Sequence, residues 1–262
     1  MKLAGQIALI IGGARGIGAT IADNFSKEGA SLVLVDLEKM KTELDAVARG
    51  INQNGGKAVV ITADCSDDRQ VNNVVDETVR RFGKIDVLIN SAGFRGPLVA
   101  VTEISDKEFD DVILYNLKLV FLCCRAVLKQ MVKQKSGSIV SISGTAGREG
   151  MAMRGSLCAA KWGVVGFTKS LSMEVGPDNI RVNAIQPGVV EGERIDRVIE
   201  AKAKAVGISF EEQKKISLER VSMHRMVSPY DIANMALYLA SDIGRNVTGQ
   251  ALSVCAGVEM LG

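Results

Sequence analysis

Residues 6–36 constrain the fold of this chain more than any other segment does. An apolar run at Ile7–Ile11 leads into loop 12–18, which reads Gly-Gly-Ala-Arg-Gly-Ile-Gly, and a helical pattern follows. A second apolar run, Ser31–Val35, ends directly before Asp36. The order of strand, glycine loop, helix, strand and acidic residue is the signature of a dinucleotide-binding βαβ unit.

The glycines of this loop have separate physical roles. Gly12 permits the tight turn, Gly16 lets the backbone approach a pyrophosphate, and Gly18 lets the helix pack closely on the sheet. The N-terminus of the helix offers free N–H groups to the phosphates. A glycine pattern alone is weak evidence of a cofactor site, but the position of this pattern between a strand and a helix predicts one.

Asp36 is expected to set the cofactor preference. A carboxylate at this position accepts hydrogen bonds from the adenosine ribose hydroxyls and repels a 2′-phosphate. Leu37 beside it supplies no compensating cation, whereas Arg15 in the glycine loop favours a 2′-phosphate. We give Asp36 the greater weight and predict NAD rather than NADP.

Apolar runs alternate with helical patterns along the chain, which is typical of a parallel sheet with helices on both faces. We predict one α/β domain over residues 1–262, a doubly wound Rossmann fold with seven parallel strands. The strands are expected at Ile7–Ile11, Ser31–Val35, Ala58–Thr62, Val87–Asn90, Ser138–Ile142, Arg181–Ile185 and Ala251–Val254. The helices are expected at Gly16–Glu28, Met40–Asn54, Asp67–Phe82, Asp106–Lys135, Leu157–Val175 and Pro229–Ala240.

Residues 191–218 depart from this rhythm, because they are charged and helix-prone and precede the final helix. They are equally compatible with a substrate lid and with a solvated pair of surface helices.

The composition argues against several kinds of binding partner. The net charge of +2 gives no long-range field for nucleic acid or an anionic membrane. No apolar stretch approaches the ~20 residues of a membrane span. Five cysteines without CxxC spacing and a single histidine predict reduced thiols, a cytoplasmic setting and no metal site. The expected partner is a small-molecule substrate.

Several motifs resemble those of the short-chain dehydrogenase/reductase family. The glycine loop fits its TGxxxGxG pattern, with Ile11 in place of threonine. Residues 90–93 (Asn-Ser-Ala-Gly) fit its NNAG motif with one change, and residues 183–188 (Asn-Ala-Ile-Gln-Pro-Gly) resemble its N-A-x-x-P-G stretch. Residues 64–65 resemble its adenine-contacting pair. The resemblance runs essentially from end to end, and the order and spacing of the motifs make it specific.

The resemblance implies a set of site residues. Those expected to bind the cofactor are Gly12, Arg15, Gly16, Ile17, Gly18, Asp36, Leu37, Asp64, Cys65, Asn90, Ala92, Gly93, Lys161, Pro187, Gly188 and Val190. Those expected to line the substrate pocket are Phe94, Ser143, Arg148, Met153, Leu157 and Val189. Arg148 or Arg154 could hold an anionic group of a substrate, although loop arginines are more often ordinary surface residues. By analogy with the family, we also expect a homotetramer or homodimer.

The family's active site uses Asn, Ser, Tyr and Lys. Asn116 and Lys161 match, but the tyrosine position is Leu157 and the serine position is Gly144. Ser143 is adjacent, yet neighbouring strand residues point in opposite directions. Leucine supplies no base and glycine no hydroxyl. General acid–base catalysis contributes ~10²–10⁴-fold, so turnover of ordinary alcohols is expected to be severely reduced.

Three functions fit this combination. The first is an NAD-dependent oxidoreductase with unusual hydride chemistry, acting on a substrate that needs no O–H deprotonation or supplies its own base. The second is a non-redox isomerase, lyase or cyclase that retains NAD. The third is a cofactor-binding pseudoenzyme. The clustering of changes around Gly144 and Leu157 favours a repurposed pocket over a single disabling change.

Overall fold

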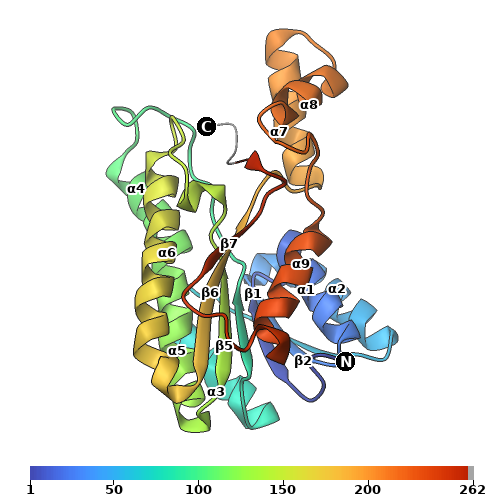
Figure 1. The fold of residues 1–262 in the computed structure, drawn as a ribbon, viewed down its shortest axis with the longest axis vertical. Coiled ribbons are helices and arrows are strands. Elements are labelled where there is room, and N and C mark those ends of the chain that lie inside the picture. The colour runs from blue at the N-terminus through green and yellow to red at the C-terminus, as the bar shows by residue number, and fades with distance from the viewer. Residues whose placement is uncertain (259–262) are drawn as a thin grey trace.

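The computed structural model describes residues 1–258, so the last four residues of the expected domain lie outside the described chain. Its strands form one parallel sheet in the order β3-β2-β1-β4-β5-β6-β7 (Figure 1). The predicted α/β Rossmann-like fold with seven strands is confirmed. The strands are β1 (Ile7–Ile11), β2 (Ser31–Asp36), β3 (Lys57–Thr62), β4 (Val87–Asn90), β5 (Gly137–Ile142), β6 (Ile180–Pro187) and β7 (Ala251–Val254).

Helices cover both faces of the sheet (Figure 1). One face packs against α1 (Gly16–Lys27), α2 (Lys41–Gln53) and α9 (Pro229–Ala240). The other packs against α3 (Asp68–Phe82), α5 (Leu119–Gln134) and α6 (Gly155–Val175). Short 3₁₀ turns occur at Glu38–Met40, Thr145–Gly147, Gly176–Asp178 and Asp242–Gly244.

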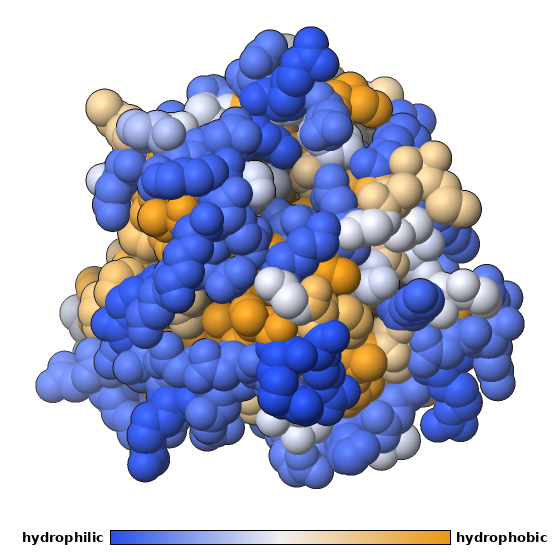
Figure 2. Space-filling view, turned by 90° about the horizontal axis from the view of Figure 1, so that it is seen from below, coloured by the Kyte–Doolittle hydropathy of each residue, from blue (hydrophilic) through white to orange (hydrophobic). Residues whose placement is uncertain are grey.

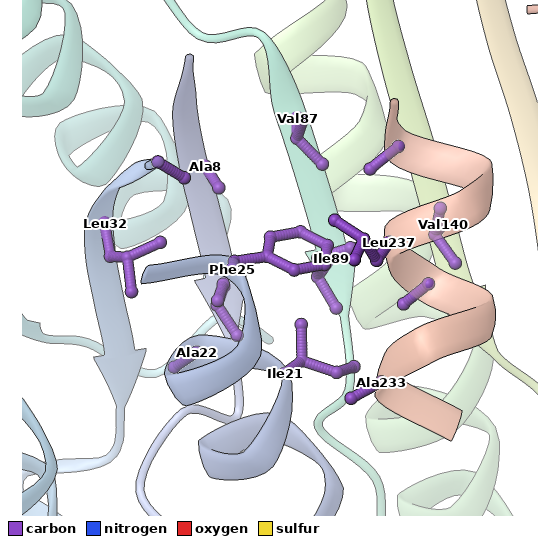
Figure 3. Packing of buried hydrophobic residues seen from close by; sticks show 14 of the residues in the cluster. Ala8, Ile21, Ala22, Phe25, Leu32, Val87, Ile89, Val140, Ala233 and Leu237 are labelled. Carbon is purple, nitrogen blue, oxygen red and sulfur yellow. The ribbon is translucent and has the colours of Figure 1, made fainter. Parts of the chain in front are cut away.

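Two apolar cores lie on either side of the sheet because successive strand residues face opposite ways. In β1, Ile10 joins the core under α1 and α9, whereas Leu9 joins the core under α3 and α5. Figure 3 shows the first of these, where Phe25 of α1 extends across the sheet towards Ile89 of β4 and Leu237 of α9. These strands are covered on both sides, which explains their nearly continuous apolar sequence.

The long helix predicted over 106–135 is interrupted in the structure. It begins as α4 (Asp106–Ile113), where Ser105 and Glu108 form a capping box, passes through a π-helical turn at Leu114–Lys118, and continues as α5. Helical periodicity alone does not reveal a π turn, since the turn adds one residue without a change of composition. Such turns often lie at functional sites, and this one carries Asn116.

Residues 191–218 form two helices, α7 (Glu193–Val206) and α8 (Phe210–Leu218). They extend past the carboxyl ends of the strands (Figure 1). A small apolar cluster of their own includes Ile199 and Leu218, with Val221 and Met226 from the following segment. A bridge between Val190 and Val227 joins the two ends of this excursion.

The strand order reverses direction between β1 and β4, and the crevice outside their carboxyl ends is where open α/β sheets bind ligands. Figure 2 shows the opposite end of the molecule, where polar residues cover most of the surface and hydrophobic residues are visible between them. Within residues 1–258, no helix combines the length and apolarity that crossing a bilayer requires.

Candidate active site

The glycine loop is held at the switch point by its own backbone. The amides of Gly12 and Gly13 both donate to the Val35 carbonyl, at 2.8 and 3.1 Å. A Cβ on Gly12 (φ 84°) would lie 2.6 Å from the Ala92 nitrogen, and a Cβ on Gly18 would overlap the Gly12 carbonyl oxygen. Both positions therefore require glycine, because the strand, the loop and α1 approach one another too closely for any side chain.

The N-terminus of α1 has the features of an anion site. The N-cap residue Arg15 makes no capping hydrogen bond, and the first turn holds no acidic side chain. Gly16 (φ 55°) has open space beside it. The N–H groups of this turn are therefore left for a ligand, and a pyrophosphate is the group that such an end binds well. This part of the chain fits a dinucleotide.

Asp36 lies at the carboxyl end of β2, where the sequence predicts the ribose-binding carboxylate. One of its oxygens accepts from the Ala14 amide (3.2 Å) and the other from the Leu37 amide (2.9 Å). The bond from Ala14 holds the carboxylate against the glycine loop, and the bond from Leu37 fixes its orientation. Each oxygen retains lone-pair capacity for a further donor.

Three other residues expected near the nucleotide are oriented by the protein interior. Asp64 accepts from the amide and hydroxyl of Ser66, at 2.9 and 2.7 Å. Cys65 is buried, and Asn90 is buried with its amide donating to the Ser141 hydroxyl at 3.1 Å. The Cys65 and Asn90 side chains thus belong to the core, and contact from either to a nucleotide would come from its backbone.

The π turn brings Asn116 to the loop after β4. Its amide nitrogen donates to the carbonyls of Phe94 (2.6 Å) and Val112 (2.9 Å), and its oxygen accepts from the Phe94 amide (3.3 Å). A Cβ on Gly93 would lie 3.0 Å from the Asn116 oxygen and 3.5 Å from the Lys161 ammonium. The structure therefore brings Asn116 and Lys161 together over Gly93, as expected from the resemblance.

Lys161 is a half-buried cation on α6. Its Nζ donates to the Ile142 carbonyl at 3.0 Å. Burial, together with the charge of the nearby Arg194, lowers the pKa of the Lys161 ammonium to about 8. Its charged form is therefore costly in the cofactor-free protein.

This cost leads to a first prediction, that Lys161→Met stabilises the cofactor-free protein at pH 7. Because the folded-state pKa lies below the unfolded value of 10.5, the penalty is fully present below pH 8. It decreases as pH rises from about 8 to 10.5, where the unfolded chain binds more protons. We expect a gain of about 1–3 kcal/mol at pH 7 that vanishes above that window.

Chemical unfolding of both proteins at pH 7 and at higher pH would measure the gain. Lys169→Met is the matched control, because Lys169 is exposed on the same helix. A less stable Lys161→Met protein at pH 7 would contradict the prediction.

Ser143 and Gly144 follow β5, and the Ser143 side chain points into α6 whereas Gly144 faces open space. Ser143 is buried, and its hydroxyl donates to the Lys161 carbonyl at 3.1 Å inside α6. Gly144 has φ 93° and ψ 170°, with open space beside its Cα. This φ lies where L residues are strained. Leu157 is half-buried on α6, one helical turn before Lys161.

The carboxyl ends of β6 and β7 close one side of the crevice. A Cβ on Gly188 would lie 2.7 Å from the Cys255 Cα, so Pro187 and Gly188 pack directly against the chain beyond β7. Arg148 donates to the Ser253 hydroxyl and lies 3.6 Å from the Cys255 sulfur. Val189 joins the apolar cluster of α7 and α8.

Apolar side chains stand at the mouth of the crevice. Phe94 and Met153 are about half exposed, and Phe94 contacts the Tyr115 ring edge-on, with 6.2 Å between centroids. Arg154 is not the surface arginine that its loop position suggested. It is buried, and its guanidinium donates to the carbonyls of residues 95–97.

One residue near the site, Arg194, was not predicted from the sequence. Arg194 opens α7 and acts electrostatically on Lys161, although 33 residues separate them. Only its place in a charged segment, residues 191–218, distinguished it in the sequence. Within the described residues, no group of three His, Cys, Asp or Glu side chains is arranged to hold a metal ion.

A doubly wound sheet, a glycine loop at its switch point and an Asn–Lys pair over the loop after β4 define a nucleotide-binding oxidoreductase. The family described as Enoyl-(Acyl carrier protein) reductase matches residues 12–259. The chain belongs to the short-chain dehydrogenase/reductase family.

Individual relatives agree with this assignment. The 3-oxoacyl-(acyl-carrier-protein) reductase FabG of Thermotoga maritima is 33% identical over 98% of this chain and 99% of its own. A variant of actinorhodin polyketide ketoreductase, solved with NADPH, is 34% identical, with a TM-score of 0.90 over 97% of both chains. NAD⁺-bound xylitol dehydrogenase is 28% identical, with a TM-score of 0.91 over 98% of this chain and 100% of its own. The cofactor is therefore NAD or NADP.

Proposed function

We propose that this protein is an NAD-dependent oxidoreductase that works without the usual side-chain acid–base pair. The observation that carries the proposal is the placement of Leu157 one turn before Lys161, whose ammonium meets Asn116 over Gly93. A nicotinamide cofactor supplies hydride transfer when bound. Leu157 holds no proton, and the Ser143 hydroxyl is engaged inside α6. The substrate would therefore need no O–H deprotonation, as in oxidation of an amine, or would carry its own base.

A substrate screen tests the proposal. NADH formation would be followed by absorbance with parallel panels of alcohols and amines, each with NAD. We expect turnover with amines or with substrates that carry an internal base, and little with simple alcohols. A uniformly silent screen would argue against redox turnover and favour an NAD-retaining isomerase, lyase or cyclase, or a pseudoenzyme.

The preference for NAD is part of the proposal, because solved relatives contain either NADPH or NAD⁺. It rests on the Asp36 carboxylate, which accepts from the Ala14 amide of the glycine loop and from the Leu37 amide. Asp36→Asn keeps the shape but removes the charge. We expect NADH affinity to fall about tenfold and NADPH affinity to rise, because a charge-assisted bond to the ribose is lost along with the repulsion of a 2′-phosphate.

Dissociation constants for both cofactors, measured by nucleotide fluorescence, would check this second prediction. Glu38→Gln is the matched control, since Glu38 is an exposed carboxylate two residues away. An unchanged ratio of the two affinities in Asp36→Asn would show that the carboxylate does not select the cofactor.

Assembly through α5 and α6 also belongs to the proposal. Large apolar side chains on these helices are exposed in the single chain, including Phe121, Trp162 and Met173, the last at 82%. Burying such side chains between copies of the chain would remove apolar surface from water. A homotetramer or homodimer would do so.

A further inference from the structure

The segment that joins β4 to α4, residues 91–105, contains neither helix nor strand. Its first turn is fixed by the Ala92 amide, which donates to the Ile11 carbonyl at 3.0 Å. The next residue along its path is held by a side chain from another element, since Asn116 binds both the amide and the carbonyl of Phe94. The course of this loop therefore depends on side chains that reach it from the helices.

A second side chain, Arg154 at the start of α6, holds the following part of the loop. Its Nη1 donates to the carbonyls of Arg95 (3.2 Å), Gly96 (3.0 Å) and Pro97 (3.0 Å). The residue is only 8% exposed, and its burial lowers the pKa of the guanidinium. Burying a charge is costly unless polar groups replace the lost water, and the three carbonyls do so here. A buried cation thus ties an irregular loop to α6.

Each end of this bridge lies next to a half-exposed apolar side chain. Phe94 directly precedes Arg95 and is 45% exposed, and Met153 directly precedes Arg154 and is 52% exposed. Consecutive Cα atoms lie about 3.8 Å apart, so neither apolar residue is far from the hydrogen bonds of the bridge. The bonds that tie the loop to α6 therefore also set the separation of Phe94 and Met153.

The backbone of Met153 is an independent sign that its side chain has a role. Its φ is 61°, in the left-handed region that glycine adopts freely and other residues rarely do. About half of the side chain remains in solvent, so burial in a core does not offset this strain. Strained residues cluster at functional sites. A methionine kept in this conformation is expected to contact a ligand.

We propose that Arg154 is a positioning residue, which holds Phe94 and Met153 as an apolar wall for the hydrophobic part of the substrate. The protein then prefers carbonyl or amine compounds with an alkyl or aromatic group several carbons long. Phe94 directly follows Gly93, above which Lys161 lies, so this wall stands beside the reaction site. The inference rests on the proposed function only in taking the crevice beside Lys161 as the substrate site.

Calorimetry with a series of methyl ketones tests the inference without requiring turnover. The protein is saturated with NAD, which cannot pass a hydride to a ketone because both are oxidised. The probes are 2-butanone, 2-hexanone and 2-octanone. We expect the dissociation constant to fall about fourfold for each added methylene that reaches the wall.

Three variants should lose most of this dependence on chain length. Arg154→Met removes the bonds to the loop, and Phe94→Ala and Met153→Ala each remove part of the wall. Arg95→Met is the matched control, since it makes the same change at an exposed residue whose carbonyl forms the bridge. This control should keep the dependence of the unmodified chain.

NADH affinity, measured by fluorescence, separates positioning from a general structural role. Arg154→Met should bind NADH as the unmodified chain does. A parallel loss of NADH affinity would assign Arg154 a general structural role and overturn the inference, as would a dependence on chain length that Arg154→Met retains or that the unmodified chain lacks.

Met153→Gly keeps the inference testable if Arg154→Met does not fold. Glycine accepts the φ of 61° without strain, so its midpoint of unfolding should rise while the dependence on ketone length falls. Retained dependence in Met153→Gly would overturn the inference. A silent redox screen with an intact ketone series would refute the proposed chemistry alone.

Discussion

Replacing Leu157 with tyrosine is expected to give this protein activity on simple ketones and alcohols at least about a hundredfold above that of the unmodified chain. The phenol would stand one helical turn before Lys161, whose charge lowers the pKa of a neighbouring hydroxyl. Leu157→Phe is the matched control, because it has the ring without the hydroxyl. The readout is NADH oxidation with ketones and NADH formation with alcohols.

Equal activities of the tyrosine and phenylalanine variants would show that the pocket differs from the family's in more than this side chain. The family's serine position could be restored as well, by Gly144→Ser. The backbone of Gly144, at φ 93°, makes that change strained by about 1–3 kcal/mol. We therefore expect the double variant to be less stable and the single tyrosine to carry most of the gain.

Gly18→Ala is expected to abolish NADH binding and to lower the free energy of unfolding by about 3 kcal/mol or more. The added methyl group would overlap the Gly12 carbonyl oxygen, and that backbone cannot move without displacing the loop from Val35 and Ala92. Helix propensity alone predicts the opposite sign, since alanine is the better helix former. Denaturant unfolding and nucleotide fluorescence would measure both effects.

Gly50→Ala is the control that separates the effect of helix propensity from the effect of close packing. Gly50 lies inside α2 with open space beside it, so alanine there should stabilise the protein by about 0.5–1 kcal/mol. If Gly18→Ala behaved like Gly50→Ala, the close approach of α1 to the glycine loop would not be the reason for a glycine at position 18.

The fold and the cofactor-binding end of the site could be predicted from short-range patterns. Strand periodicity, the glycines of loop 12–18 and the acidic residue after β2 depend on neighbours in the chain, because backbone conformation and helix ends are local properties. The predicted boundaries of β1, β4 and β7 agree with the structure, and those of the other strands agree to within a few residues. That Leu157 and Lys161 lie one turn apart on the same helix could also be predicted from the sequence.

The directions of side chains, and the contacts between groups far apart in the sequence, depend instead on how distant elements pack. Cys65 lies just beyond β3 and Asn90 ends β4, and both side chains turn into the core even though their motifs suggested the crevice. The φ of Gly144 follows from the path that the chain takes out of β5. Arg154 is buried because its guanidinium reaches the loop after β4, 59 residues away in the sequence, where it donates to the Arg95 carbonyl. Such a contact forms between groups that are distant along the chain, which is why the tertiary structure was needed to find it.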